Sequence, residues 1–452
     1  MQIWFNILDM GLSPAFGREV SSSRASRKSF EIVHKLLRTI ESYYFLLSII
    51  IIAIIFFFNE RLASEWINAD QLSIESISYC LVIMGIMIGI RWFSILYKSG
   101  INGMEDQLWL NVIIVGITSI KFFGSLFVIM FISNDIELFF EYQIIIYIVE
   151  TILLMHRFYS KSINNKLNSV FFSINYRAIK KISPFAISIA YATGVWTVIR
   201  QFDKLLLSNI LSLKEFGYMS LVTLVSSSLT AISAPLFLAM IPRMILQNSR
   251  GNVDKVMSMY LNMSEIIVWL VGGLAAIFYL FSKEIIFILT DNIEAAIWCS
   301  EVLPWHVLGS SVIVLGSCQY YLQNIIGNLK LYVIGSTVAL FLEVPLSYYI
   351  TSNYGAVGAG KLWFIFSLMW FFLLTPIVHK KYIPVIHYKW FVRLSSILLS
   401  IGISSLIIFY FVQLNIDGSK IDLAFKIILI SFFLFFVSSF SVTLFRNKVL
   451  SR

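Results

Sequence analysis

The sequence predicts an all-α polytopic membrane protein with two six-helix lobes and two additional C-terminal helices. Of its 452 residues, 58% are hydrophobic and only 13% are charged, whereas about a quarter of a soluble domain is charged. The mean hydropathy is +0.83. The apolar residues form long continuous runs, unlike the alternating segments of about ten residues that build a β-barrel. This composition excludes a soluble globular enzyme and a disordered chain.

The apolar runs give the predicted helices in order. A short, imperfect segment covers 2–16. Twelve longer runs follow, each close to or above the roughly 20 residues that cross a hydrocarbon core. They cover 42–58, 77–98, 108–133, 138–157, 183–209, 216–241, 263–282, 301–326, 329–350, 355–378, 391–412 and 424–445.

Lys and Arg gather in alternate connections, which predicts the orientation of the chain. The connections 17–41 and 158–182 are rich in them, whereas 59–76 carries one Arg and four acidic residues. Because basic connections stay in the cytoplasm, this register places the C-terminus inside and Met1 outside. The first helix of the N-lobe is then missing, and we expect about 20–40 further residues in frame upstream.

With that helix included, the chain divides into four parts. We expect an N-lobe at 1–159 with five of its six helices, a cytoplasmic linker at 160–182, a six-helix C-lobe at 183–379, and two additional helices at 380–452. Two six-helix lobes that begin on the same side of the membrane are parallel repeats.

Charged residues inside the runs are the candidate functional groups, since such residues usually face a bundle interior or a water-filled cavity. Counting residues from the shared outer turns places Lys121 level with Glu150, and Glu343 level with Lys361. These are structural ion pairs or the wall of a polar cavity, and the sequence leaves both open. Arg91 has no carboxylate at equal depth, which favours the cavity.

Two further sites stand out. Asp9 lies within the first segment, and Arg200, Asp203 and Lys204 lie where 183–209 reaches the outer interface. Long basic side chains often extend to an interface in this way. Basic residues on the outer side nevertheless run against the positive-inside rule, which favours a role in holding an anionic substrate at the outer mouth.

Nothing in the sequence predicts catalysis or a bound cofactor. The three cysteines, Cys80, Cys299 and Cys318, have neither CxxC nor Cys/His spacing, so no metal site is expected. No phosphate-binding glycine loop or Ser/His/Asp set is found. Nucleic acid is not expected either, because the basic residues lie in short connections between apolar runs.

Three stretches carry a family resemblance. Residues 2–14 read Gln-Ile-Trp-Phe-Asn-Ile-Leu-Asp-Met-Gly-Leu-Ser-Pro, and residues 200–208 read Arg-Gln-Phe-Asp-Lys-Leu-Leu-Leu-Ser. They resemble the second and seventh helices of Wzx-type O-antigen flippases, in the polysaccharide transporter branch of the multidrug/oligosaccharidyl-lipid/polysaccharide (MOP) superfamily. Residues 213–218, Leu-Lys-Glu-Phe-Gly-Tyr, continue the likeness, which extends in order along nearly the whole chain. Shorter matches are Arg18-Glu19, Pro235, Ile241-Pro242-Arg243, Tyr320-Tyr321-Leu-Gln323, Gly327-Asn328 and residues 354–359, Tyr-Gly-Ala-Val-Gly-Ala.

The resemblance implies a MATE-like fold and a function. The implied substrate is an oligosaccharide linked to undecaprenyl pyrophosphate, moved from the cytoplasmic to the periplasmic leaflet of the bacterial inner membrane, with polymerase and chain-length proteins as possible pathway partners. Substrate-binding cations would be Arg91, Lys121, Arg200, Lys204 and Lys361. Ion-coupling or cavity carboxylates would be Asp9, Glu150, Asp203 and Glu343.

Two rival functions remain. A drug exporter of the same superfamily would favour an excess of carboxylates in its cavity, whereas the charges inside these runs are predominantly basic. An integral-membrane polymerase or ligase needs a large outer loop, and the 59–76 connection is too short to supply one.

Overall fold

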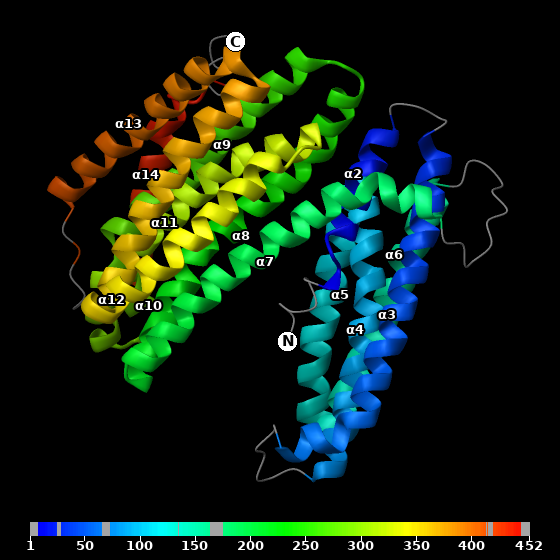
Figure 1. Ribbon diagram of the computed structural model, residues 1–452. Coiled ribbons are helices and arrows are strands. Elements are labelled where there is room, and N and C mark those ends of the chain that lie inside the picture. Colours follow the sequence, from blue (N-terminus) through cyan, green and yellow to red (C-terminus); the bar gives the residue numbers. More distant parts are fainter. Residues whose placement is uncertain are drawn as a thin grey trace. The chain divides into compact units, whose positions relative to one another are not determined.

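The computed structural model describes residues 8–24, 29–65, 73–133, 135–162, 175–412, 414 and 419–443, and these form an all-helical protein (Figure 1). The chain divides into two compact units, Met1–Ala190 and Tyr191–Arg452, with the boundary inside one long helix. The predicted fold class is confirmed, because the long helices are those of a polytopic membrane protein.

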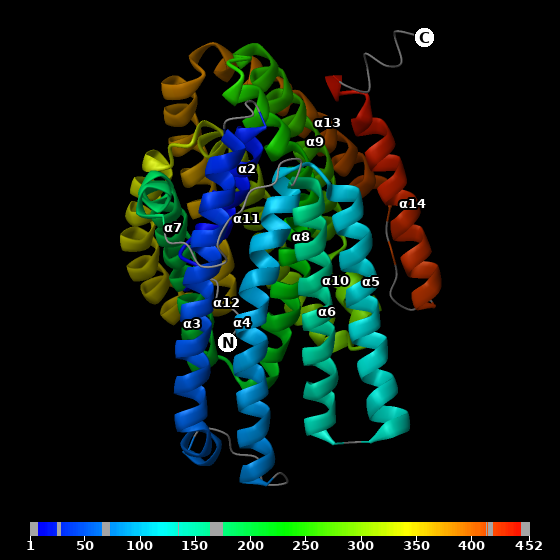
Figure 2. The same cartoon turned by 90° about the vertical axis from the view of Figure 1, so that its right-hand side faces the viewer.

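The first unit holds helices α2 to α6 and the beginning of α7. The helices are α2 (Leu12–Ser23), α3 (Ser29–Glu65), α4 (Ile74–Gly103), α5 (Gln107–Phe127) with a π-helical extension (Val128–Ile132), α6 (Ile136–Ser162) and α7 (Tyr176–Ile210). Figures 1 and 2 show α3, α4, α5 and α6 side by side along most of their length.

The second unit begins at Tyr191, within α7, and continues to the end of the chain. Its helices are α8 (Leu213–Ser249), α9 (Val253–Leu280), α10 (Ser282–Thr290), α11 (Ile293–Ile326), α12 (Lys330–Tyr382), the short η2 (Pro384–Ile386), α13 (His387–Phe411) and α14 (Lys420–Ser439). In the described part of the chain, eleven helices are long and apolar enough to cross a membrane.

Each of the twelve predicted long runs lies largely within one of these helices. Twelve runs correspond to eleven long helices because α12 contains two runs, 329–350 and 355–378, which meet at Gly355. Gly355 has φ 60° and ψ −151°, a conformation that interrupts the helix and that glycine adopts without steric cost. The polypeptide therefore turns at Gly355, and the two helical segments of α12 are joined through this single residue.

Local side chains fix where several helices begin. Ser212 caps α8 by a capping box: its Oγ accepts from the Glu215 backbone N–H at 3.3 Å, and Glu215 Oε2 accepts from the Ser212 N–H at 3.0 Å. Asn292 caps α11 through two backbone N–H groups. At the other end of α11, Gly327 takes the left-handed conformation common after a helix.

The beginning of the chain differs from the prediction. Helix α2 starts at Leu12, inside the segment predicted at 2–16, and continues to Ser23 in the supposed connection 17–41; residues 2–7 of that segment lie outside the described residues. The extension buries Val20 completely, which accounts for its stability. Asp9–Gly11 forms a turn ahead of the helix, and α10 is a further helix that the sequence did not predict because its nine residues form no span.

Gly11 shows why this turn needs glycine. Its φ is 68°, and a Cβ placed on it would lie 2.3 Å from the Ala186 carbonyl oxygen of α7. Any other residue would be strained and would also push the two helices apart. The beginning of α2 therefore packs directly on the backbone of α7 within the first unit.

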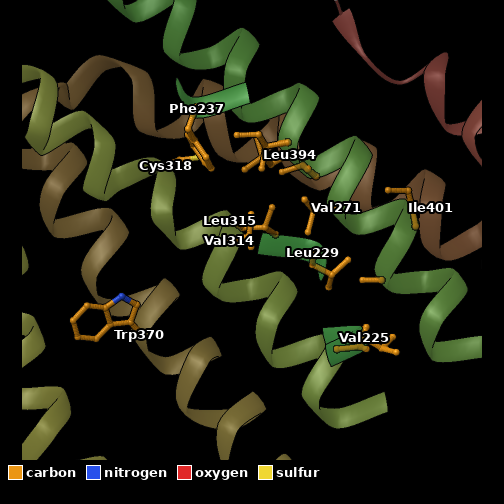
Figure 3. Close-up of a cluster of buried hydrophobic side chains, with 14 of the residues drawn as sticks. Val225, Leu229, Phe237, Val271, Val314, Leu315, Cys318, Trp370, Leu394 and Ile401 are labelled. Carbon is orange, nitrogen blue, oxygen red and sulfur yellow. The ribbon is translucent and has the colours of Figure 1, made fainter. Parts of the chain in front are cut away.

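Each unit has its own apolar core. In the first, Phe16, Tyr44, Trp92 and Phe158 are almost fully buried among α2, α3, α4 and α6. In the second, side chains from α8, α9, α11 and α13 meet in a larger cluster, part of which is drawn in Figure 3. Many large apolar side chains on the outer faces of α5, α13 and α14 are exposed, as expected of helices that face lipid.

The last two helices are fastened to α9 by a buried carboxylate. Glu265 is completely buried; its Oε1 lies 2.6 Å from Arg393 Nη1 of α13, and its Oε2 accepts from the Thr443 backbone N–H at 2.9 Å. The predicted division at 159, 182 and 379 remains a prediction, and residues 163–174 of the predicted linker lie outside the described residues.

Candidate functional site

The first unit carries a set of charges on α4, α5 and α6, which we call the N-unit charged face: Arg91, Lys98, Lys121 and Glu150. Arg91, Ser94 and Lys98 follow one another at spacings of three and four residues, so they share one side of α4. Ser94 and Thr151 of α6 join their hydroxyls at 2.6 Å. This side of α4 therefore packs against α6.

Glu150 is buried and forms an ion pair with Lys98, not with Lys121 as the depth count predicted. Lys121 Nζ instead lies 4.2 Å from the centre of the Tyr147 ring, a cation–π contact. Equal depth failed as a criterion because it does not say which side of a helix a residue occupies. One signal in the sequence was overlooked. Lys98 lies seven residues after Arg91, on the same side of α4, and was therefore a second candidate partner for Glu150.

Arg91 is the cation without a partner. Its side chain is half-buried, and within the described ranges no hydrogen bond, ion pair or ring contact involves it. The N-unit charged face thus holds three cations and one carboxylate. Since Lys98 neutralises Glu150, the positive charges of Arg91 and Lys121 remain unbalanced by any carboxylate on this face.

Asp9 lies in the turn before α2, and one of its carboxylate oxygens accepts several hydrogen bonds. Its Oδ1 accepts from the Ser13 backbone N–H at 3.3 Å and from Ser13 Oγ at 2.6 Å, and it also accepts from the Tyr44 hydroxyl. The Tyr44 ring stacks on Trp92 with 6.1 Å between centroids. These bonds tie the turn before α2 to Ser13 in the first turn of that helix and to Tyr44 of α3.

In the second unit, α7 and the first half of α12 run in parallel and exchange polar contacts. We call the group of polar side chains Tyr191, Arg200, Asp203, Thr337, Glu343 and Ser347 the α7–α12 seam. The Tyr191 and Thr337 hydroxyls lie 2.8 Å apart, and the Ser347 hydroxyl donates to Asp203 Oδ1. The two contacts advance together along both helices, which establishes the parallel direction.

Glu343 is the unusual member of the seam. It is 2% exposed, and its Oε2 has no hydrogen-bond partner within the described part of the chain. Asp203 and Arg200 are close enough to interact with it electrostatically. The seam therefore holds two neighbouring carboxylates, one of them buried with an unused oxygen, and buried polar atoms of this kind are rare in native proteins.

The predicted pair of Glu343 with Lys361 is not formed. Lys361 is exposed, and its Nζ lies 5.4 Å from the centre of the Trp305 ring. Glu343 faces α7 instead. Here too, equal depth in the membrane does not bring two side chains together, because they point to different sides of their helices.

The remaining predicted cations lie near the end of α7. Arg200 and Lys204 are both exposed and one turn apart on the same helix face. Lys214 at the start of α8 bonds to Glu294 of α11 at 2.6 Å. Of the two predicted cations, Arg200 is close enough to interact electrostatically with Glu343 of the seam, whereas Lys204 is exposed on the surface.

An acidic group between helices ties together one end of the first unit. Asp106 Oδ2 lies 2.7 Å from Arg157 Nε and 2.9 Å from Lys161 Nζ of α6. Burial acts to raise the pKa of Asp106, but the hydrogen bonds and charges of the two cations outweigh it and hold the pKa below its usual value. Asp106 itself lies in the connection between the spans Ile74–Gly103 and Gln107–Ile132.

The fold and these sites define the class: a multi-pass, all-helical membrane protein with paired bundles and charges inside its spans. No family model matches the sequence, and no curated protein matches it.

Solved structures place the fold more narrowly. A mutant of the Vibrio cholerae MATE transporter VcmN superposes with a TM-score of 0.71 at 11% identity, covering 84% of this chain and 86% of that one. The crystal structure of MATE in the straight conformation superposes with a TM-score of 0.68 at 11% identity, covering 84% of this chain and 86% of that one. A MOP superfamily transporter from Pyrococcus furiosus gives 0.66 at 13% identity, with coverage of 83% and 85%. The chain has a MATE-like fold.

Proposed function

We propose that this protein is a flippase that carries oligosaccharides linked to undecaprenyl pyrophosphate from the cytoplasmic to the periplasmic leaflet of a bacterial inner membrane. The observation that carries the proposal is the positive surplus of the N-unit charged face, in which Arg91 has no partner among the described residues. A cation inside an apolar span is costly and usually serves a pathway or a ligand. A pyrophosphate group would supply the missing negative charge.

The type of cation supports the same ligand. The planar guanidinium of Arg91 can donate two parallel hydrogen bonds to a phosphate, which the point charge of a lysine cannot do. Lys121, already held over the Tyr147 ring, would add charge without fixed geometry. Arg200, Lys204 and Lys361 are exposed and would act as weaker, long-range attractors.

Carboxylates supply the coupling in this proposal. Glu343 and Asp203 lie near each other, and the unused oxygen of Glu343 offers a site for a proton or a monovalent cation. Asp9 and Glu150 are already bonded to Ser13, Tyr44 and Lys98, so they are weaker candidates for coupling. Exchange between leaflets would follow the alternating-access motion of transporters built from repeats.

A multidrug exporter is the second candidate, favoured by the unpartnered Glu343 carboxylate of the seam, which could attract a cationic drug. The Pyrococcus furiosus neighbour is described as having a binding pocket of reversed polarity that suggests a different function. The sign of the intramembrane charge is therefore a reasonable criterion between the two functions. In the first unit that sign is positive.

Expression in a bacterium that lacks its own O-antigen flippase, with the matching sugar pathway present, tests the proposal. We expect the wild-type chain to restore surface polysaccharide and to leave resistance to cationic drugs unchanged. Raised drug resistance without polysaccharide, at normal protein abundance in the membrane, would establish the exporter instead.

A further inference from the structure

Aromatic rings from four helices of the second unit form a continuous series, which we call the aromatic ladder. The rings of Phe237 and Tyr321 lie 4.2 Å apart, those of Tyr321 and Tyr320 5.0 Å, and those of Tyr320 and Tyr332 4.5 Å. The series continues from Tyr332 to Trp370 at 6.2 Å, and from Trp370 to Trp196 at 5.4 Å. It thus joins α8, α11, α12 and α7.

The rings of the ladder differ in how deeply they are buried. Phe237 and Trp370 are buried, and Figure 3 includes both among the core side chains. Tyr320, Tyr332 and Trp196 are only half-buried. Mutual stacking stabilises such rings modestly, but it leaves part of their surface available to another molecule.

Polar atoms beside the ladder lack partners. Gln319 Nε2 and Ser336 Oγ are both buried without a hydrogen bond in the described residues, whereas the Trp196 indole N–H points at the Tyr332 hydroxyl. The Gln319 and Ser336 residues are 2% and 0% exposed, respectively. More than about 90% of buried polar groups are hydrogen-bonded. Two such atoms beside one series of rings are therefore available to hydrogen-bond with a ligand.

The orientation of Gln319 is fixed by its neighbours. Gln323 Nε2 donates to Gln319 Oε1 at 2.8 Å, and Gln323 Oε1 accepts from the Tyr332 backbone N–H at 3.0 Å. Gln319 therefore keeps its amide N–H groups free as donors. On the other side, a Cβ added to Gly335 would lie 2.9 Å from the Trp370 ring, so only glycine lets that ring approach α12 so closely.

From this arrangement we infer that the aromatic ladder is a carbohydrate subsite, in which a pyranose ring stacks on Tyr320 and Tyr332 and one of its hydroxyls accepts from Gln319. The inference rests on the proposed function. A sugar ring has an apolar C–H face and a polar rim, which suits a site of aromatic faces with a few placed donors. Arg200, four residues after Trp196, interacts electrostatically with Tyr332 and would lie beside the same sugar.

Two lipid probes separate this subsite from the proposed function. The protein in nanodiscs is titrated with undecaprenyl pyrophosphate and with undecaprenyl-pyrophosphate-linked N-acetylglucosamine, and both dissociation constants are measured. We expect the sugar-bearing probe to bind about tenfold more tightly, the size of one or two good aromatic contacts. Tyr320→Leu should remove that preference while leaving the bare probe unaffected, and Tyr320→Phe should retain most of it.

Tyr388→Leu is the matched control, since Tyr388 is 79% exposed on α13 and its loss should leave both constants unchanged. Equal binding of the two probes by the wild type would overturn the subsite while the flippase proposal stands. Loss of both probes in Tyr320→Leu would show that the ring is structural and would also overturn it. Binding of neither probe by the wild type would contradict the proposed function, and the subsite with it.

Discussion

The N-unit charged face and the α7–α12 seam differ in how they hold their charged groups. In the N-unit charged face Glu150 is paired with Lys98, and Arg91 has no partner among the described residues. The second unit keeps two carboxylates together at the α7–α12 seam, with one oxygen of Glu343 unused. This difference suggests a division of labour, in which the first unit attracts an anion and the second binds a proton or cation.

The largest effect is expected at Arg91. Arg91→Ala should reduce surface polysaccharide by tenfold or more, because a hydrogen bond to a charged group contributes about 1.5–3 kcal/mol. Arg91→Lys should restore only part of it, since one point charge replaces a bidentate fork. Polysaccharide is measured beside protein abundance, with Arg250→Ala, an exposed residue after α8, as the control. Loss of the protein itself in Arg91→Ala would assign the residue to packing.

Glu343 should behave differently from a structural carboxylate. Glu343→Gln removes no hydrogen bond at Oε2, so we expect the free energy of unfolding to change by less than about 1 kcal/mol. Transport should lose its dependence on an imposed proton or sodium gradient. Thermal unfolding in detergent and transport in vesicles measure the two quantities. A strongly destabilised variant, or one with unchanged gradient dependence, would remove the contrast between the units.

The Lys98–Glu150 pair should behave as a structural contact. Glu150→Gln should lower the free energy of unfolding by about 3 kcal/mol, the lower end for breaking a buried pair. The double change Lys98→Met with Glu150→Leu should recover most of that loss. Lys121→Gln is the comparison, because a cation–π contact contributes about 1 kcal/mol. If Lys121→Gln were as destabilising as Glu150→Gln, the pairing seen here would be wrong.

The smallest effect is expected from Asp106, and it depends on pH. Its pKa is lowered in the folded state, so the stabilisation is fully present above the unfolded pKa of about 3.9 and is lost as pH falls through the folded pKa. Between pH 6 and pH 3 the wild type should lose more stability than Asp106→Asn. The difference should be about 1 kcal/mol or less, because Lys161 is 42% exposed. Equal losses in both proteins would contradict the assignment.

The sequence was sufficient for the helices and insufficient for their contacts. All twelve long runs lie largely in helices, because roughly 20 apolar residues have few alternatives in a membrane. The pairs Lys121–Glu150 and Glu343–Lys361 were wrong because depth fixes one coordinate of a side chain and its direction around the helix is set by packing. The extension of α2 beyond residue 16 was missed for the same reason, because it depends on the burial of Val20 against other helices.

The predicted site residues remain predictions, and the structure shows only which contacts they make. Arg91 was identified as a cation without a matching carboxylate, and the structure leaves it without a partner in the described part of the chain. Lys98 was overlooked because it lies at the edge of the run 77–98, from which its long side chain reaches Glu150. The aromatic ladder could not be foreseen, since its six rings come from four helices that meet only in the folded unit.

Transport in proteoliposomes tests the central proposal most directly. Vesicles containing the wild-type protein and an undecaprenyl-pyrophosphate-linked sugar in one leaflet are sampled for sugar exposed on the other leaflet, beside vesicles containing Arg91→Ala. We expect rapid transfer with the wild type, little with Arg91→Ala, and no uptake of a cationic dye by either. Transfer of the dye by wild-type vesicles, with the lipid-linked sugar remaining in its original leaflet, would contradict the flippase and support a drug exporter.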